Sequence, residues 1–262
     1  MRALIAGAGR LPTLIKRTHE GPLHVVALDD FPPDDLVPNR VFCIEHLGSL
    51  LDALVSEGIK SVCFAGSIAR PPIDPSKIDA ATMPLVPAMM EALQQGDDAA
   101  LRTVVGFFED RGIEVIAAHD IVPELLPPAG VHTEKSPDAQ AESDAARAAD
   151  IGSCLGAADI GQALVVRKGQ ALAIEGQFGT DWMLASLKER PDTGGGLLFK
   201  APKPDQDRRI DLPTIGPATI KAAADATLDG IVVETGGVLV LDLEATIKAA
   251  NDAEVFLWVR DR

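Results

Sequence analysis

The chain has 262 residues, enough for one large domain or for two of about 100 to 150 residues each, and we expect two. Apolar residues make up 47% of it and charged residues 24%, which is typical of a folded globular protein and excludes a disordered or fibrous one. The formal net charge of −15 would repel a polyphosphate backbone, and no stripe of Lys and Arg with interleaved aromatics is present. Nucleic acid is therefore not an expected partner, whereas an anionic small molecule is, because a local group of Lys and Arg can hold phosphate.

The cysteines and the N-terminus bear on the compartment. Cys43, Cys63 and Cys154 are widely spaced and lie among apolar residues, which is not typical of a disulfide framework or a zinc site, so we predict three core thiols. The opening MRALIAGAGRLP is too short an apolar stretch for a signal peptide. No later run reaches the roughly 18 apolar residues of a membrane span. We therefore expect a cytoplasmic protein.

In the first half, short β-type runs alternate with helical patterns. Strands are predicted at 3–6, 23–28, 61–65 and 114–117, and helices from about Leu11 and at 47–56, 83–94 and 99–111. Strands that alternate with helices predict a Rossmann-like, doubly wound parallel sheet, whose ligands bind beyond the carboxyl ends of the strands. We assign residues 1–130 to this N-terminal domain.

A Pro- and Gly-rich stretch at 127–137 breaks the alternation, and we place the interdomain linker there. Behind it we predict helices at 138–155, 181–188 and 218–226 and one before the last strand, a hairpin of strands at 163–166 and 171–174, and further strands at 197–200, 230–234, 238–241 and 255–258. This pattern predicts a second α/β domain, residues 131–262, with a mixed sheet. We expect a ligand cleft between the two domains.

Several strand ends of the first domain carry candidate substrate-binding residues. Gly7 and Gly9 lie in a turn from a strand to a helix, whose N–H groups could hold a phosphate, although a tight turn without a ligand is the alternative. Arg70 follows another strand and could contact phosphate in a bidentate way, or it is a solvated loop arginine. His119 follows the last predicted strand, where it could bind phosphate or transfer a proton, or serve only the structure.

The segment EGQFGTDWML places Glu175 beyond a predicted strand and Thr180 and Asp181 at the start of a helix. Asp181 could simply cap that helix. The three side chains could also form an oxygen-rich site for Mg²⁺ or for a water molecule.

The loop KAPKPDQDRRIDLPTIGPAT, which starts at Lys200, is the strongest functional candidate. Two lysines, two arginines and three aspartates occur within 200–211, and the prolines exclude a regular helix. Lys200, Lys203 and Arg209 are suited to phosphoryl oxygens, and Asp207 and Asp211 to a divalent cation or to water. Gln206 is a further candidate for substrate binding. A solvated surface loop is the alternative.

These segments together resemble a known family. IAGAGRLP, AGSIARP, GDDAALR, AHDIVPELL, DIGQALVV, EGQFGTDWML and KPDQDRRIDLPTIGPAT, in this order, are similar to the LpxI family of UDP-2,3-diacylglucosamine pyrophosphatases of lipid A biosynthesis. The resemblance implies a two-domain enzyme, peripheral to the inner membrane, that uses Mg²⁺ to hydrolyse this glycolipid nucleotide to UMP and 2,3-diacylglucosamine 1-phosphate (lipid X). One departure is that many relatives read GGGxLP where this chain has Ala8 between the two glycines.

The resemblance also implies where the site residues lie. The essential aspartate of the family falls in QDRRIDLP, so it is Asp207 or Asp211, and we assign both, with Arg209, to catalysis. Asp207, Asp211, Glu175 and Asp181 are the expected Mg²⁺ ligands. The acyl chains need an apolar groove, for which the segments 83–90 and 104–108 are candidates, with core packing as the alternative. The sequence does not fix an oligomeric state.

Two rival functions follow from the same residues. A nicotinamide- or nucleotide-dependent oxidoreductase would use the first domain, but Pro12 stands where the dinucleotide fingerprint has its third glycine. A non-catalytic module would bind a sugar nucleotide without turning it over.

Overall fold

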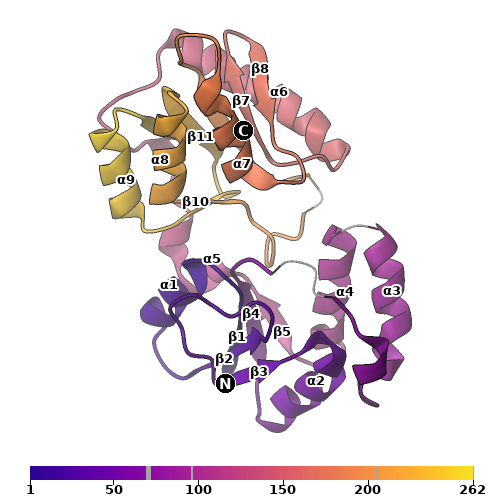
Figure 1. The fold of residues 1–262 in the computed structure, drawn as a ribbon. Helices are drawn as coiled ribbons and strands as arrows, with labels where there is room; N and C mark the ends of the chain where they lie inside the picture. The colour runs from indigo at the N-terminus through magenta and orange to yellow at the C-terminus, as the bar shows by residue number, and fades with distance from the viewer. Residues whose placement is uncertain (69–71, 96, 205, 262) are drawn as a thin grey trace. The chain divides into compact units, whose positions relative to one another are not determined.

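A computed structural model describes residues 1–68, 72–95, 97–204 and 206–261 of the chain (Figure 1). It divides into two compact units, Met1–Val122 with Asp207–Ile210 as unit 1, and Pro123–Gln206 with Asp211–Arg262 as unit 2. The segment Asp207–Ile210 therefore belongs with unit 1, although the residues on either side of it belong to unit 2.

Unit 1 contains a five-stranded sheet of order β3-β2-β1-β4-β5, in which every pair is parallel. The strands are β1 (Arg2–Ala6), β2 (Leu23–Leu28), β3 (Arg40–Phe42), β4 (Ser61–Ala65) and β5 (Glu114–Ile116). The helices are α1 (Leu11–Thr18), α2 (Leu47–Ser56), α3 (Val86–Gln95), α4 (Asp97–Glu109) and α5 (Ala118–Ile121), with 3₁₀ turns at Ile44–His46, Pro75–Lys77 and Met83–Leu85. This arrangement confirms the predicted Rossmann-like domain and adds β3, a strand of three residues.

The core of unit 1 lies between its sheet and the helices that follow the strands. Ile5, Val26 and Val62 of the strands pack with Leu51 of α2 and Phe108 of α4. Their burial follows from the sequence, because a parallel strand covered on both faces is apolar along its whole length.

Unit 2 contains a six-stranded mixed sheet of order β6-β13-β11-β9-β7-β8. Its strands are β6 (Gly130–Val131), β7 (Ala163–Arg167), β8 (Gln170–Ile174), β9 (Leu197–Lys200), β11 (Gly230–Glu234) and β13 (Phe256–Arg260). The centre, β9-β11-β13, is parallel, and β6, β7 and β8 run antiparallel to their neighbours. The mixed strand directions confirm the prediction for the second domain.

The remaining elements of unit 2 are helices, 3₁₀ turns and a second, smaller sheet. They are α6 (Ala139–Ala157), α7 (Gly179–Ser186), α8 (Pro217–Asp225) and α9 (Leu243–Asp252), 3₁₀ turns at Pro123–Leu125 and Leu187–Glu189, and a two-stranded parallel sheet of β10 (Thr214–Ile215) and β12 (Leu239–Val240). The α6 helix begins where Asp138 accepts a hydrogen bond from Ala141 N at 2.8 Å.

Two expectations need correction. Within the predicted linker at 127–137, Gly130–Val131 forms β6 and pairs with β13, so this part is a strand of the second sheet. Of the three predicted core thiols, Cys63 is buried, Cys43 is half-buried and Cys154 is exposed, because Cys154 lies on an outer face of the amphipathic α6. Among the described residues, no helix is both long and apolar enough to cross a membrane.

Candidate functional site

The loop after β9 is anchored to α6 and folded on itself within unit 2. Lys203 Nζ pairs with Asp159 at 2.5 Å, beyond the end of α6. Gly156 allows this approach, since a Cβ at this position would lie 2.8 Å from Pro204 Cδ. Gln206 joins the two sides of the loop, because its Oε1 accepts from Lys203 N at 3.1 Å while its Nε2 donates to Asp211.

The middle of the loop, Asp207–Ile210, is held in unit 1. Arg209 donates to Asp207 through its backbone N–H at 3.0 Å, its Nε at 3.0 Å and its Nη2 at 2.7 Å, and Arg209 Nη1 reaches Glu109 of α4 at 2.7 Å. Ile210 packs against the core of unit 1. The hydrogen bonds from Arg209, strengthened by the nearby Arg102, lower the pKa of Asp207, and they fix the orientation of an ionised carboxylate.

Lys200, Thr180 and Glu175 form a buried polar network in unit 2. Lys200 Nζ donates to Thr180 Oγ1 at 2.9 Å and to Thr214 O at 3.2 Å, and Thr180 Oγ1 donates to Glu175 Oε1 at 2.6 Å. Gln162 N donates to Glu175 Oε2 at 2.9 Å. The side chains meet because β7 runs antiparallel to both β8 and β9, so the start of β7 and the ends of its neighbours lie at one edge.

Burial dominates the electrostatics of this network. Lys200 is 7% exposed, Glu175 8% and Thr180 9%. Desolvation lowers the pKa of Lys200, while the carboxylates of Glu175 and Asp181 act in the opposite direction. Lys200 is thus turned into the protein at the end of β9, and Glu175 uses both carboxylate oxygens for internal hydrogen bonds.

The expected Mg²⁺ ligands are divided between the two units, with Asp207 in unit 1 and Asp211, Glu175 and Asp181 in unit 2. The described part of the chain holds no group of three or more His, Cys, Asp or Glu side chains arranged for a metal ion. Mg²⁺ often keeps several waters and is bound by one or two carboxylates together with substrate phosphates. For such a site Asp207 offers an ionised carboxylate whose orientation Arg209 fixes.

The N–H groups of the turn after β1 donate hydrogen bonds to acceptors within the protein. Gly7 N donates to Ala65 O at 2.8 Å, Ala8 N to Ser67 O at 2.9 Å, and Gly9 N to Asp34 Oδ2 at 3.1 Å. A Cβ at Gly7 would lie 2.5 Å from Ser67 O, so glycine is needed here for the close approach of two backbones. A carboxylate of the protein therefore lies where the sequence predicted a phosphate, and a ligand anion would have to displace Asp34.

His119 is a further candidate of unit 1, and it carries a buried ring nitrogen. His119 lies in α5, half-buried, and its Nδ1 is buried without a hydrogen-bond partner among the described residues. Such an atom is costly to leave unpaired, which is compatible with a ligand there. Arg70 lies outside the described residues.

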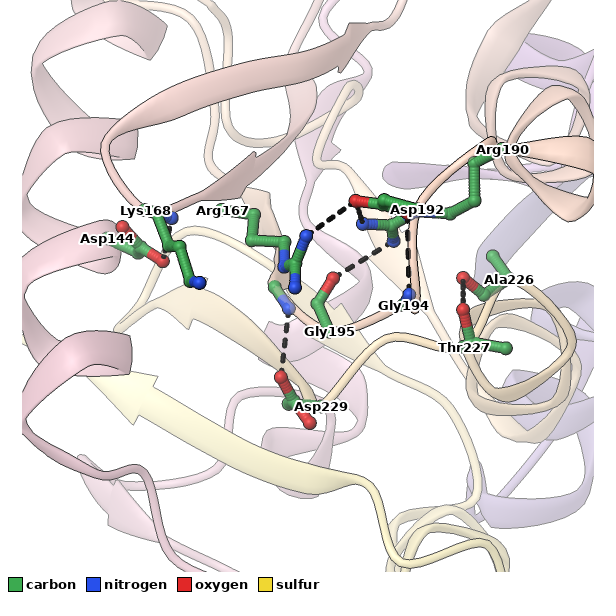
Figure 2. Close-up of polar contacts among 11 residues, drawn as sticks. Asp144, Arg167, Lys168, Arg190, Asp192, Gly194, Gly195, Ala226, Thr227 and Asp229 are labelled. Carbon is green, nitrogen blue, oxygen red and sulfur yellow. Dashed lines mark hydrogen bonds and ion pairs between the residues drawn. The ribbon is translucent and has the colours of Figure 1, made fainter.

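A second polar cluster, at the opposite edge of the sheet of unit 2, holds a glycine-rich turn (Figure 2). Asp192 lies between Arg167, at 2.6 Å, and Arg190, whose Nη2 is 2.7 Å away. Arg190 Nη1 donates to Gly195 O at 2.9 Å, and Gly196 N donates to Asp229 Oδ2 at 2.9 Å. These contacts shape the turn before β9 and satisfy its backbone, so the cluster serves the structure.

Hydrogen bonds join the candidates in three groups. Lys200, Thr180 and Glu175 are together, as are Lys203, Gln206 and Asp211 and, in unit 1, Asp207 and Arg209. Glu109, Asp159 and Asp34 were not among the predicted residues, because each is distant in sequence from the residue that it binds. Of the three, only Glu109 could have been suspected from the local sequence, because it is an acidic residue at the end of an amphipathic helix.

Comparison with known proteins covers both halves of the chain. Residues 1–125 match the model of the LpxI N-terminal domain, and residues 128–258 match that of the LpxI C-terminal domain. The chain is 40% identical over 266 aligned residues to a curated protein of Caulobacter vibrioides named UDP-2,3-diacylglucosamine pyrophosphatase LpxI, and the match covers 97% of this chain and 95% of that protein.

Proposed function

The chain belongs to the LpxI family, and we propose that it hydrolyses the pyrophosphate bond of UDP-2,3-diacylglucosamine to UMP and 2,3-diacylglucosamine 1-phosphate. The observation that carries this proposal is the 40% identity along nearly the whole length of a relative whose name states the activity. An unrelated oxidoreductase would not be expected to match over both domains. The turn after β1 also lacks the third glycine of the dinucleotide fingerprint.

In this proposal, Asp207 orients the attacking water, either directly or through a cation that binds the water. Hydrolysis joins the water oxygen to one phosphorus, breaks the bond from that phosphorus to the bridging oxygen and releases one proton to solvent. A good general base has a pKa near the working pH, whereas Arg209 holds the pKa of Asp207 below its usual range. We therefore assign Asp207 to orientation and charge stabilisation, and Arg209 to its positioning.

Lys203 supplies a positive charge for the phosphates. Its partner Asp159 is 62% exposed at the side chain, so their ion pair is worth less than about 1 kcal/mol and is easily exchanged for a phosphoryl oxygen. Lys200 has a different role. It is buried and bound to Thr180 and Thr214, so it positions the start of the loop.

We propose Mg²⁺ as the cofactor, held by Asp207 or Asp211 together with the two phosphates of the substrate. When bound, Mg²⁺ would neutralise charge on the phosphoryl oxygens. In the assay, EDTA should abolish hydrolysis and added Mg²⁺ should restore it. A rate that does not respond to EDTA would remove the metal from the mechanism.

The substrate named for the relative carries two acyl chains and a nucleotide. We therefore propose that the enzyme works in the cytoplasm and takes its substrate from the surface of the inner membrane. Release of the activity from vesicles of bacterial lipid by a wash of moderate salt would fit peripheral contact, and activity confined to the unbound fraction would contradict it.

The decisive experiment is hydrolysis of UDP-2,3-diacylglucosamine by the purified protein with Mg²⁺ in ¹⁸O-labelled water. Label in 2,3-diacylglucosamine 1-phosphate would establish the activity and place water attack at the phosphorus on the sugar side. Label in UMP would keep the activity and reverse the attack. Binding without products would contradict hydrolysis and support a non-catalytic sugar-nucleotide module.

A further inference from the structure

Unit 1 contains an apolar cavity of about 380 Å³ beside α3, within the range of small-molecule sites. Its walls come from three segments, namely the residues after β3, the stretch that leads from β4 to α3, and α3 itself. The apolar lining residues that matter here are Ile44, Ile73, Ile78, Val86, Met89 and Met90. Because two of the segments follow the carboxyl ends of β3 and β4, the cavity lies at the edge of a parallel sheet where ligands bind.

The polar side chains of the cavity wall are already bound within the protein. Glu45 is 7% exposed, and its Oε1 accepts a hydrogen bond from Asp74 N at 2.7 Å. Thr82 is 1% exposed, and its Oγ1 accepts from Gly48 N at 2.8 Å. None of the described residues that line the cavity carries a positive charge. A phosphate, a nucleotide or a sugar would therefore lose its hydration here without gaining charged partners.

The wall is suited to a flexible apolar chain. Met89 packs against the core, whereas Met90 is 50% exposed and lies at the mouth, so the cavity is lined from inside to outside by two adaptable side chains. Met90 is continuous with the other apolar residues of the cavity wall, and a contiguous apolar surface of this kind is what marks a binding site.

We propose that this cavity binds one acyl chain of the glycolipid substrate. The inference rests on the proposed function for its ligand, because the substrate named for the relative is diacylated, and on the cavity for its place. The segment 83–90, for which core packing and an acyl groove were alternatives, thus serves both, with Met89 toward the core and Met90 toward the ligand.

Two methionines provide a matched pair of variants. Met90 lines the cavity and Met83 does not, and they are 50% and 54% exposed. Met90→Glu and Met83→Glu therefore add the same charge at similarly exposed positions. The kcat/KM of each variant is measured for UDP-2,3-diacylglucosamine with myristoyl chains and with butyryl chains.

Met90→Glu should lower kcat/KM for the myristoyl substrate by about tenfold, which corresponds to losing the burial of about two methylene groups. Met90→Glu should change kcat/KM for the butyryl substrate by no more than about twofold. Met83→Glu should change kcat/KM by no more than about twofold for either substrate. An equal loss for both chain lengths, or no loss for the myristoyl substrate, would overturn the acyl site while the wild-type activity upholds the proposed function.

A second measurement does not depend on turnover. The wild-type protein is irradiated with a fatty acid that carries a terminal diazirine, and the labelled peptides are identified by mass spectrometry. Label between Ile73 and Leu93 that Met90→Glu abolishes supports the acyl site, even if no hydrolysis is found and the proposed function fails. Label confined to other segments overturns the site.

Discussion

Lys200 Nζ lies 2.9 Å from Thr180 Oγ1, and the same hydroxyl donates to Glu175, so a buried ammonium and a buried carboxylate are joined through one threonine. Neither charge is solvated, since Lys200 is 7% and Glu175 8% exposed. Removing either charge would therefore leave the other buried and unpaired, which lowers the stability of the fold. Because Lys200 ends β9 and Thr214 O also accepts from it, the network ties the start of the functional loop to β10.

The first prediction concerns the stability of this network. Lys200→Met should lower the free energy of unfolding by about 3 kcal/mol, because it leaves Glu175 buried without its cation. The double variant Lys200→Met/Glu175→Gln should regain most of this loss, since no buried charge remains. Urea unfolding of the two single variants and the double variant measures the coupling, and additive losses would contradict a joined pair.

The same lysine predicts a dependence on alkaline pH. Since burial lowers the pKa of Lys200 in the folded protein, the unfolded chain binds more protons between that lowered pKa and the usual value of 10.5. The contribution of Lys200 to stability should therefore rise with pH across this window. The difference in unfolding free energy between wild type and Lys200→Met, followed upward from pH 7, should grow, and a constant difference would refute the shift.

Substitution of the two aspartates of the loop should distinguish their contributions to catalysis. Asp207→Asn should lower kcat at least a hundredfold, because it removes a charge that Arg209 holds in position and whose contacts form mainly in the transition state. Asp211→Asn should cost less, since an amide can still accept from Gln206. A larger loss in Asp211→Asn than in Asp207→Asn would exchange the two assignments.

Arg209 should act through Asp207. Arg209→Lys retains the charge but not the fork that contacts both oxygens of the carboxylate, so kcat should fall by about tenfold or more with little change in KM. The pKa of Asp207, measured by NMR, should rise toward its usual range in this variant. A lower kcat with an unchanged pKa would show that Arg209 acts on the substrate directly.

The alternation of apolar strands and helices predicted most of the fold, because each buried parallel strand leaves a local apolar run. The missed strands β3, β6 and β10 have two or three residues, and long-range pairing defines them. The functional site, like the fold, was predictable only where its signal is local in the sequence. The loop was recognised from its charges, but the distant partners of Arg209 and Gly9, Glu109 and Asp34, are set by tertiary contacts. Nor does the sequence show that Lys200 points inward.

Glycine at the turn after β1 gives a further prediction. Gly7→Ala should lower the unfolding free energy by about 1–3 kcal/mol, because its Cβ would lie 2.5 Å from Ser67 O and the backbones must separate. Gly9→Ala is the control, since no atom lies within 4 Å of its Cβ and only its φ of +94° opposes alanine. Urea midpoints of the two variants measure the difference, and an equal or larger loss in Gly9→Ala would contradict a steric role for Gly7.

The last prediction concerns acid. Arg190 and Arg167, with Gly194 N, lower the pKa of Asp192 from 3.8 to about 2 (Figure 2). A carboxylate with a lowered pKa stabilises the fold above its unfolded pKa and loses that contribution as pH falls through the folded one. The difference in unfolding free energy between wild type and Asp192→Asn should therefore be constant from pH 7 to about 4 and shrink toward pH 2. In Arg190→Gln, NMR should find the pKa of Asp192 closer to 3.8, and a pKa that stays near 2 would show that Arg190 is not its main cause.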